Sequence, residues 1–170
     1  MALGEYIVWA AKYYLPGMIA NASPLLVKGT KLIDGGKRFI DGKPVFGGHK
    51  TWEGFAIGVV NAYITGAALG FILGDPWIQV LSVITGASAM TGDLIGAFVK
   101  RRLSIPPGRP LPVVDQLSFA LTITLVYFIL GVEEVVKHLD FIAATLILIF
   151  ILHVLTNYVA YILGIKDEKL

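Results

Sequence analysis

The stretch WIQVLSVITGASAMTGDLIGAFV at residues 77–99, followed at once by KRR at residues 100–102, decides the fold of this chain. Asp93 is the single charge within it. About 20 mainly apolar residues are enough for a helix to cross the roughly 30 Å hydrocarbon layer of a membrane. The stretch therefore predicts a transmembrane helix whose last turn reaches a basic membrane boundary.

The rest of the chain is similarly apolar. Of its 170 residues, 56% are hydrophobic and 15% are charged, and the mean hydropathy is +0.75; about a quarter of an ordinary soluble domain is charged. We expect an all-α integral membrane protein, one transmembrane domain over residues 1–170, because the apolar runs leave no length for a separate soluble domain. The five predicted transmembrane helices are residues 6–27, 54–73, 77–99, 113–130 and 141–163.

Small residues and prolines mark how these helices should pack. The Pro16-Gly17 pair predicts a kink in the first span. Glycines at four-residue spacing, such as Gly54 and Gly58 or Gly92 and Gly96, favour close approach of helix backbones in lipid. The absence of cysteine excludes disulfides, thiolate metal sites and a catalytic cysteine.

Lysine and arginine gather on one side of the predicted membrane helices. They occur in the loops of about residues 28–53 and 100–112 and in the tail, whereas the segments 74–76 and 131–140 on the other side carry Lys137 as their only cation. Positively charged loops face the cytosol in multi-pass membrane proteins. We therefore expect the N-terminus outside, the C-terminus in the cytosol, and a large cytosolic loop between the first two helices.

The loop of residues 28–53 carries glycines between its lysines and ends in Gly-Gly-His-Lys-Thr-Trp-Glu-Gly at residues 47–54. Glycines permit tight turns and close backbone approach, and lysines and backbone N–H groups neutralise phosphate oxygens. The pattern indicates a phosphate-binding loop, although it lacks the spacing of a nucleotide-binding P-loop. A topology signal or a contact with anionic lipid is the alternative interpretation of the same charges.

Two aspartates should meet at the cytosolic boundary. Asp93 lies below Lys100 on one helical face, and Asp115 begins the next helix after a short proline-rich loop. A carboxylate at that depth is costly unless it is paired or bound to a cation. We expect both to bind Mg²⁺ that carries a substrate phosphate. Alternatively, Asp93 pairs with an arginine and Asp115 caps its helix.

These motifs resemble a known enzyme family. The series Gly92-Asp93, Lys100-Arg101, Pro107-Gly108 and Asp115 is similar to the signature of CDP-diglyceride synthetases, the phosphatidate cytidylyltransferases, and residues 50–54 are similar to a second motif of that superfamily. Ala97 and Gln116 depart from the bacterial pattern. Together with the short chain, they make the sequence resemble the archaeal branch, the CDP-archaeol synthases.

The resemblance implies a Mg²⁺-dependent membrane enzyme that joins CTP to 2,3-di-O-geranylgeranylglyceryl phosphate and releases pyrophosphate. We expect a multi-pass protein of the cell membrane, acting as a single copy or a homodimer, with membrane lipid but no nucleic acid as a partner. The catalytic residues would be Lys50, Asp93, Lys100 and Asp115, with both aspartates on the metal. The substrate-binding residues would be Asn21, Lys37, His49, Thr51, Arg101 and Arg102.

Other functions fit parts of the pattern. A CDP-diacylglycerol synthase would act on acyl phosphatidate instead, and a transporter would also place acids and small residues within its spans. A transporter built on an inverted repeat would show two related halves, whereas the two loop motifs here differ. A lipid-binding scaffold would not need Asp93 below the membrane boundary. His153 and Asn157, four residues apart in the last span, are typical of contacts between helices.

The charge asymmetry makes a testable prediction about topology. A cysteine introduced at Lys43 should react with a membrane-impermeant thiol reagent only after the cytosolic side is opened, and native cysteines do not interfere because the chain has none. Labelling of this position exclusively from outside intact cells would contradict the predicted orientation.

Overall fold

The computed structural model describes residues 3–106 and 109–164, and within these ranges the regular structure is helical. Two isolated β-bridges, Leu32 with Thr51 and Arg38 with Pro44, are the only strand-like pairings in the described ranges. The helices run in the order α1 (Leu3–Tyr13), α2 (Leu15–Ala22), the 3-10 helix η1 (Ser23–Leu26), α3 (Trp52–Leu73), α4 (Trp77–Arg102), α5 (Val114–Ile129), α6 (Glu133–Val136) and α7 (Leu139–Ile162). The expected all-α fold is confirmed.

Three helices are long and apolar enough to cross a membrane: Trp52–Leu73, Trp77–Arg102 and Leu139–Val159. The fourth expected span, α5, has 16 residues, which corresponds to about 24 Å at 1.5 Å per residue. The structure thus supports a membrane protein, while the count of five spans and their orientation stay predictions.

The first expected span, residues 6–27, is not one continuous helix. It is divided into α1, α2 and η1, with a turn at Tyr14. Pro16 has no N–H to donate to the carbonyl four residues earlier, and Pro24 in η1 ends α2 for the same reason. The kink expected at the Pro16-Gly17 pair is therefore present, but it comes with a second interruption before Leu26.

The boundary at the end of α4 also differs from expectation. The helix continues through Lys100, Arg101 and Arg102, which were expected to lie in a loop. Cations in the last turn of a helix are favoured by the negative end of the helix dipole. The three basic side chains therefore project from one helical turn. Successive side chains point in directions about 100° apart around the helix axis.

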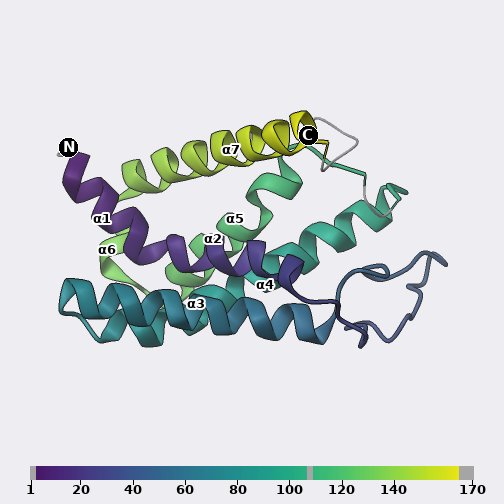
Figure 1. Ribbon diagram of the computed structural model, residues 1–170, viewed down its shortest axis with the longest axis horizontal. Helices are drawn as coiled ribbons and strands as arrows, with labels where there is room; N and C mark the ends of the chain where they lie inside the picture. Colours follow the sequence, from purple (N-terminus) through teal and green to yellow (C-terminus); the bar gives the residue numbers. More distant parts are fainter. Residues whose placement is uncertain (1–2, 107–108, 165–170) are drawn as a thin grey trace.

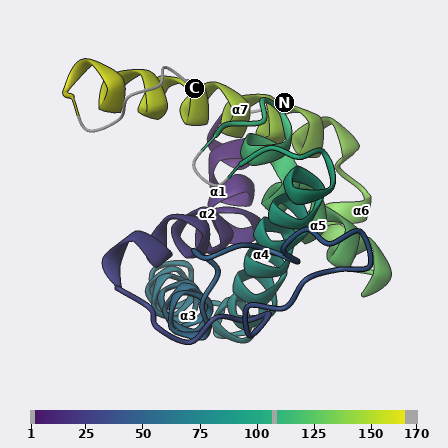
Figure 2. The same cartoon turned by 90° about the vertical axis from the view of Figure 1, so that its right-hand side faces the viewer.

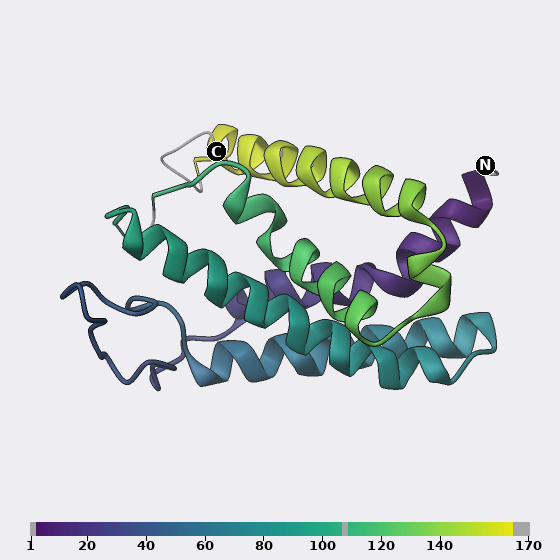
Figure 3. The ribbon, with the colours of Figure 1, turned by 180° about the vertical axis from the view of Figure 1, so that it is seen from behind.

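Close packing of α3, α4 and α5 depends on small residues. One face of α3 repeats Gly54, Gly58, Ala62, Gly66 and Gly70 at four-residue spacing, and all five are buried. On α4, a Cβ atom at Gly92 would lie 2.6 Å from Phe119 Cα and from Ser118 O of α5. The expected role of spaced glycines in helix contact is borne out. Figures 1 and 2 show α3 and α4 side by side, and α5 lies behind them in Figure 1 and in front of them in the reverse view of Figure 3.

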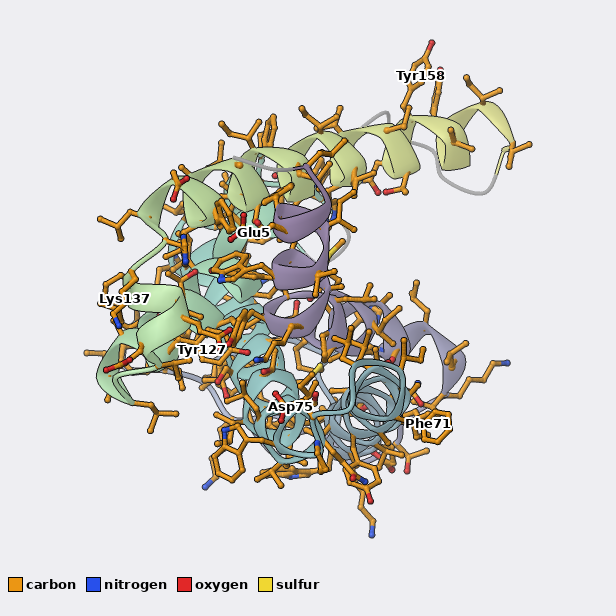
Figure 4. The ribbon with its side chains drawn as sticks, turned by 90° about the vertical axis from the view of Figure 1, so that its left-hand side faces the viewer. Glu5, Phe71, Asp75, Tyr127, Lys137 and Tyr158 are labelled. Carbon is orange, nitrogen blue, oxygen red and sulfur yellow. The ribbon has the colours of Figure 1, made fainter. Side chains whose placement is uncertain are left out.

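Polar contacts fasten the end of the bundle that lies opposite the long loop. The Lys12 ammonium lies 3.2 Å from Asp75 in the α3–α4 turn and 3.3 Å from Glu134 in α6. The buried Tyr127 hydroxyl donates to the Tyr13 carbonyl at 2.9 Å. Figure 4 looks onto this end, with Tyr127 enclosed between elements and Phe71 pointing outward. These contacts hold α1 against the later helices at the end away from the candidate site.

Candidate functional site

The loop between η1 and α3 begins and ends on a short paired stem. Ile33 N–H donates to Lys50 O at 2.9 Å, and Trp52 N–H donates to Lys31 O at 2.9 Å. The carboxylate of Glu53 accepts the backbone N–H groups of Thr30 and Lys31, each at 3.2 Å. Figure 1 shows the loop extending beyond the ends of α3 and α4. The stem places Lys50 next to the first turn of α3.

Asp34 organises the middle of this loop. Its carboxylate accepts backbone N–H groups from Gly36 at 2.9 Å, Phe46 at 2.9 Å and Gly47 at 3.4 Å. Partial burial raises the pKa of this carboxyl, but the backbone donors favour the ionised form and leave the pKa below its ordinary value. Gly36 and Gly47 have φ angles of +73° and +98°, which L side chains rarely adopt. Asp34 therefore fixes the segment that leads to Lys50.

The loop and two helices enclose a cavity of about 130 Å³. The loop contributes its carboxyl-terminal end, α4 contributes one face of its last three turns, and α5 contributes its first turn. The lining residues are Phe46, Gly47, His49, Lys50, Asp93, Ala97, Lys100, Arg101 and Asp115. Six of the residues expected to act on substrate thus line one small cavity at one end of the apolar helices.

Two lysine–aspartate pairs cross this cavity. Lys50 Nζ lies 2.7 and 2.6 Å from the carboxylate oxygens of Asp93, which joins the loop to α4. Lys100 Nζ lies 3.0 and 2.7 Å from those of Asp115, which joins α4 to α5. The four side chains are between 13% and 29% exposed, so each pair is shielded from most of the solvent. The alternative in which Asp93 pairs with an arginine is wrong, because its partner is Lys50.

Asp115 has a second contact besides Lys100. It accepts the Leu111 backbone N–H at 2.8 Å, which fixes the approach to α5. The alternative in which Asp115 caps its helix is wrong, because the N-cap position of α5 is Val113, no side chain caps that end, and the bond from Leu111 belongs to the segment before the helix. The same carboxylate still lines the cavity, so Asp115 both holds the segment before α5 and contributes to the cavity wall.

Arg101 is the buried cation of the site. The residue is 7% exposed and lines the cavity. Its Nε atom is buried with no hydrogen-bond partner in the part of the chain that the structure describes. A buried donor without an acceptor is costly, and an anion in the cavity would satisfy it. Arg101 is therefore a candidate for anion contact, although an unsatisfied Nε alone does not define a phosphate site, because the Nε of Arg102, which does not line the cavity, is also buried without a partner among the described residues.

Four other expected site residues lie outside the lining of this cavity. Asn21 is on α2, and Lys37 is an exposed loop residue. Thr51 caps α3, because its hydroxyl accepts the Gly54 N–H at 3.2 Å. The Arg102 guanidinium contacts Asp41 of the loop at 2.6 Å instead of lining the cavity. The structure gives Thr51 and Arg102 structural contacts and brings neither Asn21 nor Lys37 to the cavity.

The residues that the sequence argument missed include Asp34 and Asp41. Each precedes a glycine, in Asp34-Gly35-Gly36 and Asp41-Gly42, and each carboxylate accepts the N–H of the residue two positions later. This Asp-Gly pattern is typical of side-chain-stabilised turns. It could have assigned both aspartates to loop structure, but it does not reveal the further contacts with Phe46 or Arg102.

The donor set suits a cation that is shared with a substrate. Within the described residues no group of three or more His, Cys, Asp or Glu side chains is arranged to hold a metal ion. The cavity nevertheless contains two carboxylates, Asp93 and Asp115. Mg²⁺ is commonly bound by one or two carboxylates, with water and phosphate oxygens completing its octahedron. Asp93 and Asp115 are therefore the residues of the cavity that would hold a magnesium ion, with phosphate and water oxygens as its other ligands.

Comparison with known proteins assigns the family. The sequence matches the CarS-like family model, described as CDP-archaeol synthase, over residues 4–169. A CDP-archaeol synthase of Staphylothermus marinus is 49% identical over 164 residues, covering 96% of this chain and 93% of that protein. The chain belongs to the CDP-archaeol synthase family. A CDP-archaeol synthase of Sulfurisphaera tokodaii is 40% identical over 167 residues, covering 98% of each chain.

A solved structure agrees with this membership. It is described as an intramembrane enzyme for archaeal membrane lipids biosynthesis, and it is 34% identical to this chain with a TM-score of 0.78. The match covers 87% of this chain and 92% of the other. The resemblance to CDP-archaeol synthases is thus confirmed, and the chain is a nucleotidyltransferase of membrane lipid biosynthesis.

Proposed function

We propose that the chain transfers the cytidylyl group of CTP to an ether-linked isoprenoid glycerol phosphate, 2,3-di-O-geranylgeranylglyceryl phosphate, and forms CDP-archaeol and pyrophosphate. The observation that supports this is the cavity in which two lysine–aspartate pairs and the buried Arg101 meet. Family membership supports the reaction class, and the apolar helices beside the cavity support a lipid substrate.

The chemistry needs no nucleophile from the protein. A lipid phosphate monoester is largely ionised near neutral pH, because its second pKa is about 6. One of its oxygens attacks the α-phosphorus of CTP, a new P–O bond forms, and the bond between the α-phosphorus and the bridging oxygen breaks as pyrophosphate leaves. The obstacle is repulsion between two polyanions, so the work of the protein is positioning and charge stabilisation.

The cationic side chains of the cavity approach the proposed phosphate position from different elements. Lys50 enters from the loop, and Lys100 and Arg101 enter from the last turn of α4. In this proposal the lysines leave their aspartate partners to contact phosphate oxygens, and Arg101 takes an oxygen at its unsatisfied Nε. Asp93 and Asp115 are then available to Mg²⁺, which supplies charge neutralisation when bound.

The size of the cavity restricts what enters it. Pockets for drug-sized ligands commonly have about 300–1,000 Å³, and this one has about 130 Å³. We therefore place the reacting phosphates in it and the rest of each substrate outside it. The nucleoside would therefore lie toward the loop, and the isoprenoid chains would leave sideways between the helices into the membrane.

We also propose a multi-pass location in the cell membrane with five spans. The segment α1–η1, residues 3–26, would form a broken first span and α5 a short fourth one. The site then lies at the cytosolic boundary, where CTP is available, because residues 28–51 and 100–113 carry 10 of the 14 lysines and arginines.

The lipid preference provides the test of the proposed reaction. Purified protein with CTP and Mg²⁺ should release pyrophosphate with a higher kcat/KM for the geranylgeranyl ether phosphate than for diacyl phosphatidate of matched chain length. Omission of the lipid should abolish release. A higher kcat/KM for the diacyl substrate would instead support the alternative, a CDP-diacylglycerol synthase.

The metal assignment predicts the behaviour of two charge-removing variants. Asp93→Asn and Asp115→Asn should each reduce turnover by about 100-fold or more, and each should lose the rise in melting temperature that Mg²⁺ with CTP gives the wild type. Without metal, Asp93→Asn should melt below the wild type, because the half-buried Lys50 ammonium loses its counter-ion.

Asp75→Asn is the matched control for these variants. Asp75 also pairs with a lysine, Lys12, at 3.2 Å, but at the opposite end of the bundle. This variant should keep both its turnover and its response to Mg²⁺ with CTP. Full activity of Asp93→Asn with an unchanged Mg²⁺ dependence would contradict the metal site.

A further inference from the structure

Arg102 joins the tip of the long loop to the end of α4. Its Nη1 atom donates to Asp41 Oδ1 at 2.6 Å, and its Nη2 atom donates to the carbonyl of Pro44. The loop also donates to α4, because Lys43 Nζ donates a hydrogen bond to the Arg102 carbonyl at 2.8 Å. The last residue of α4 therefore holds loop residues 41–44 by both its side chain and its backbone.

Two aromatic rings enclose the same guanidinium. The Arg102 Cζ atom lies 4.8 Å from the ring centroid of Phe39 in the loop and 4.8 Å from that of Phe98 in α4. The two rings meet edge to face with centroids 5.3 Å apart. A planar guanidinium can stack on rings while its two amino groups donate in different directions, and a lysine ammonium cannot do both. A lysine at this position should therefore keep the charge but weaken the contact.

We call this set of contacts the clasp; it consists of Arg102, Asp41, Pro44 and the rings of Phe39 and Phe98. The clasp is next to the cavity along the chain. Pro44 is two residues from Phe46, which lines the cavity and whose N–H donates to Asp34. The loop segment between the clasp and Lys50 is therefore held at both ends. Arg102 itself is absent from the lining, whereas its neighbours Lys100 and Arg101 belong to it.

We propose that Arg102 is a positioning residue, which acts through the clasp to hold Phe46–Lys50 in the geometry that the phosphates require. This role rests on the proposed function, because its effect on turnover is transmitted through Lys50 and the cavity. It differs from the role expected from sequence, in which Arg102 contacts a phosphate directly.

Asp41 distinguishes the two roles. If Arg102 bound a phosphate, removal of the competing carboxylate would leave CTP binding unchanged or stronger. If Arg102 acts through the clasp, Asp41→Asn should damage turnover in the same way as Arg102→Lys, although Asp41 carries the wrong charge to bind phosphate. The double variant should be no worse than either single one, since both remove the same contact.

The kinetic experiment measures kcat and the KM for CTP in these three variants. We expect Arg102→Lys and Asp41→Asn each to lower kcat by about 10- to 100-fold, the size of effect that follows from a small misplacement of reacting groups, with a smaller change in KM. Lys31→Ala is the matched control, because Lys31 is an exposed cation of the same loop. Its kinetic constants should match those of the wild type.

A second measurement reports on the loop without requiring turnover. Ile40 is 95% exposed at the loop tip, and the chain has no cysteine, so Ile40→Cys accepts a single nitroxide label. The electron paramagnetic resonance spectrum should show a restrained label in the wild-type background and faster motion with Arg102→Lys or Asp41→Asn. Lys31→Ala should leave the spectrum unchanged.

Two outcomes would overturn the positioning role. In the first outcome, Arg102→Lys raises the KM for CTP, whereas Asp41→Asn keeps the kinetic constants and the label motion of the wild type. That result would make Arg102 a phosphate ligand. The other is a mobile label with wild-type kcat in both variants. A wild-type protein that converts no CTP and lipid phosphate would refute the proposed function itself, and the label spectra identify that case because they do not depend on activity.

Discussion

The ion pair between Lys50 and Asp93 is the contact on which the site depends. A carboxylate within an apolar helix needs a partner, and its partner here comes from a loop that is separated from it by 43 positions in the sequence. Three sets of contacts hold the loop in the position that brings Lys50 to Asp93. The stem places Lys50 beside α3, Asp34 fixes the turn before it, and the Arg102 clasp holds the tip against α4.

The pairs also explain how a cavity rich in charge can exist before any substrate binds. Lys50 and Lys100 neutralise Asp93 and Asp115 at distances of 2.6 to 3.0 Å, so neither carboxylate is left buried and unpaired. In the proposed reaction, Lys50 and Lys100 would contact phosphate oxygens, and Asp93 and Asp115 would hold Mg²⁺, whose chemistry there would be charge neutralisation. Arg101 differs from the lysines, because its buried Nε has no such partner among the described residues and is the group with most to gain from an anion.

Much of this arrangement is predictable from the sequence, because helix geometry decides it. Asp93 and Lys100 are seven residues apart and share a face, and a short loop returns the chain to Asp115, so their convergence follows from spacing alone. The same geometry separates Arg101 from Arg102. Successive helical residues point about 100° apart, so one lines the cavity and the other faces the loop. The packing of α4 against its neighbours decides whether Arg101 or Arg102 lines the cavity, and this packing cannot be predicted from the sequence of α4 alone.

The remaining features depend on the path of the loop in space. Lys50, and not an arginine, is the partner of Asp93 because of the stem between residues 31–33 and 50–52. Thr51 was expected to bind substrate, but its place directly before α3 makes its hydroxyl a helix cap. The break of the first span at Pro16 was readable from the missing N–H, whereas the short 3-10 helix after it depends on Pro24 and on contacts with α3. The helix break at Pro16 was thus predicted, the local roles of Thr51, Asp34 and Asp41 were missed although the sequence carries a signal for them, and the pairing of Lys50 with Asp93 required the path of the loop.

The most direct test of the account exchanges the charges of the central pair. Lys50→Glu and Asp93→Lys, each alone, should lower the melting temperature and abolish turnover, because each places two like charges together. In the double variant the ion pair can form in reverse, so the melting temperature should recover toward that of the wild type. Turnover should stay absent, since the carboxylate for Mg²⁺ and the ammonium for the phosphate have changed places. Recovery of turnover together with stability would contradict the account and reduce the Lys50–Asp93 pair to a contact that only holds the fold.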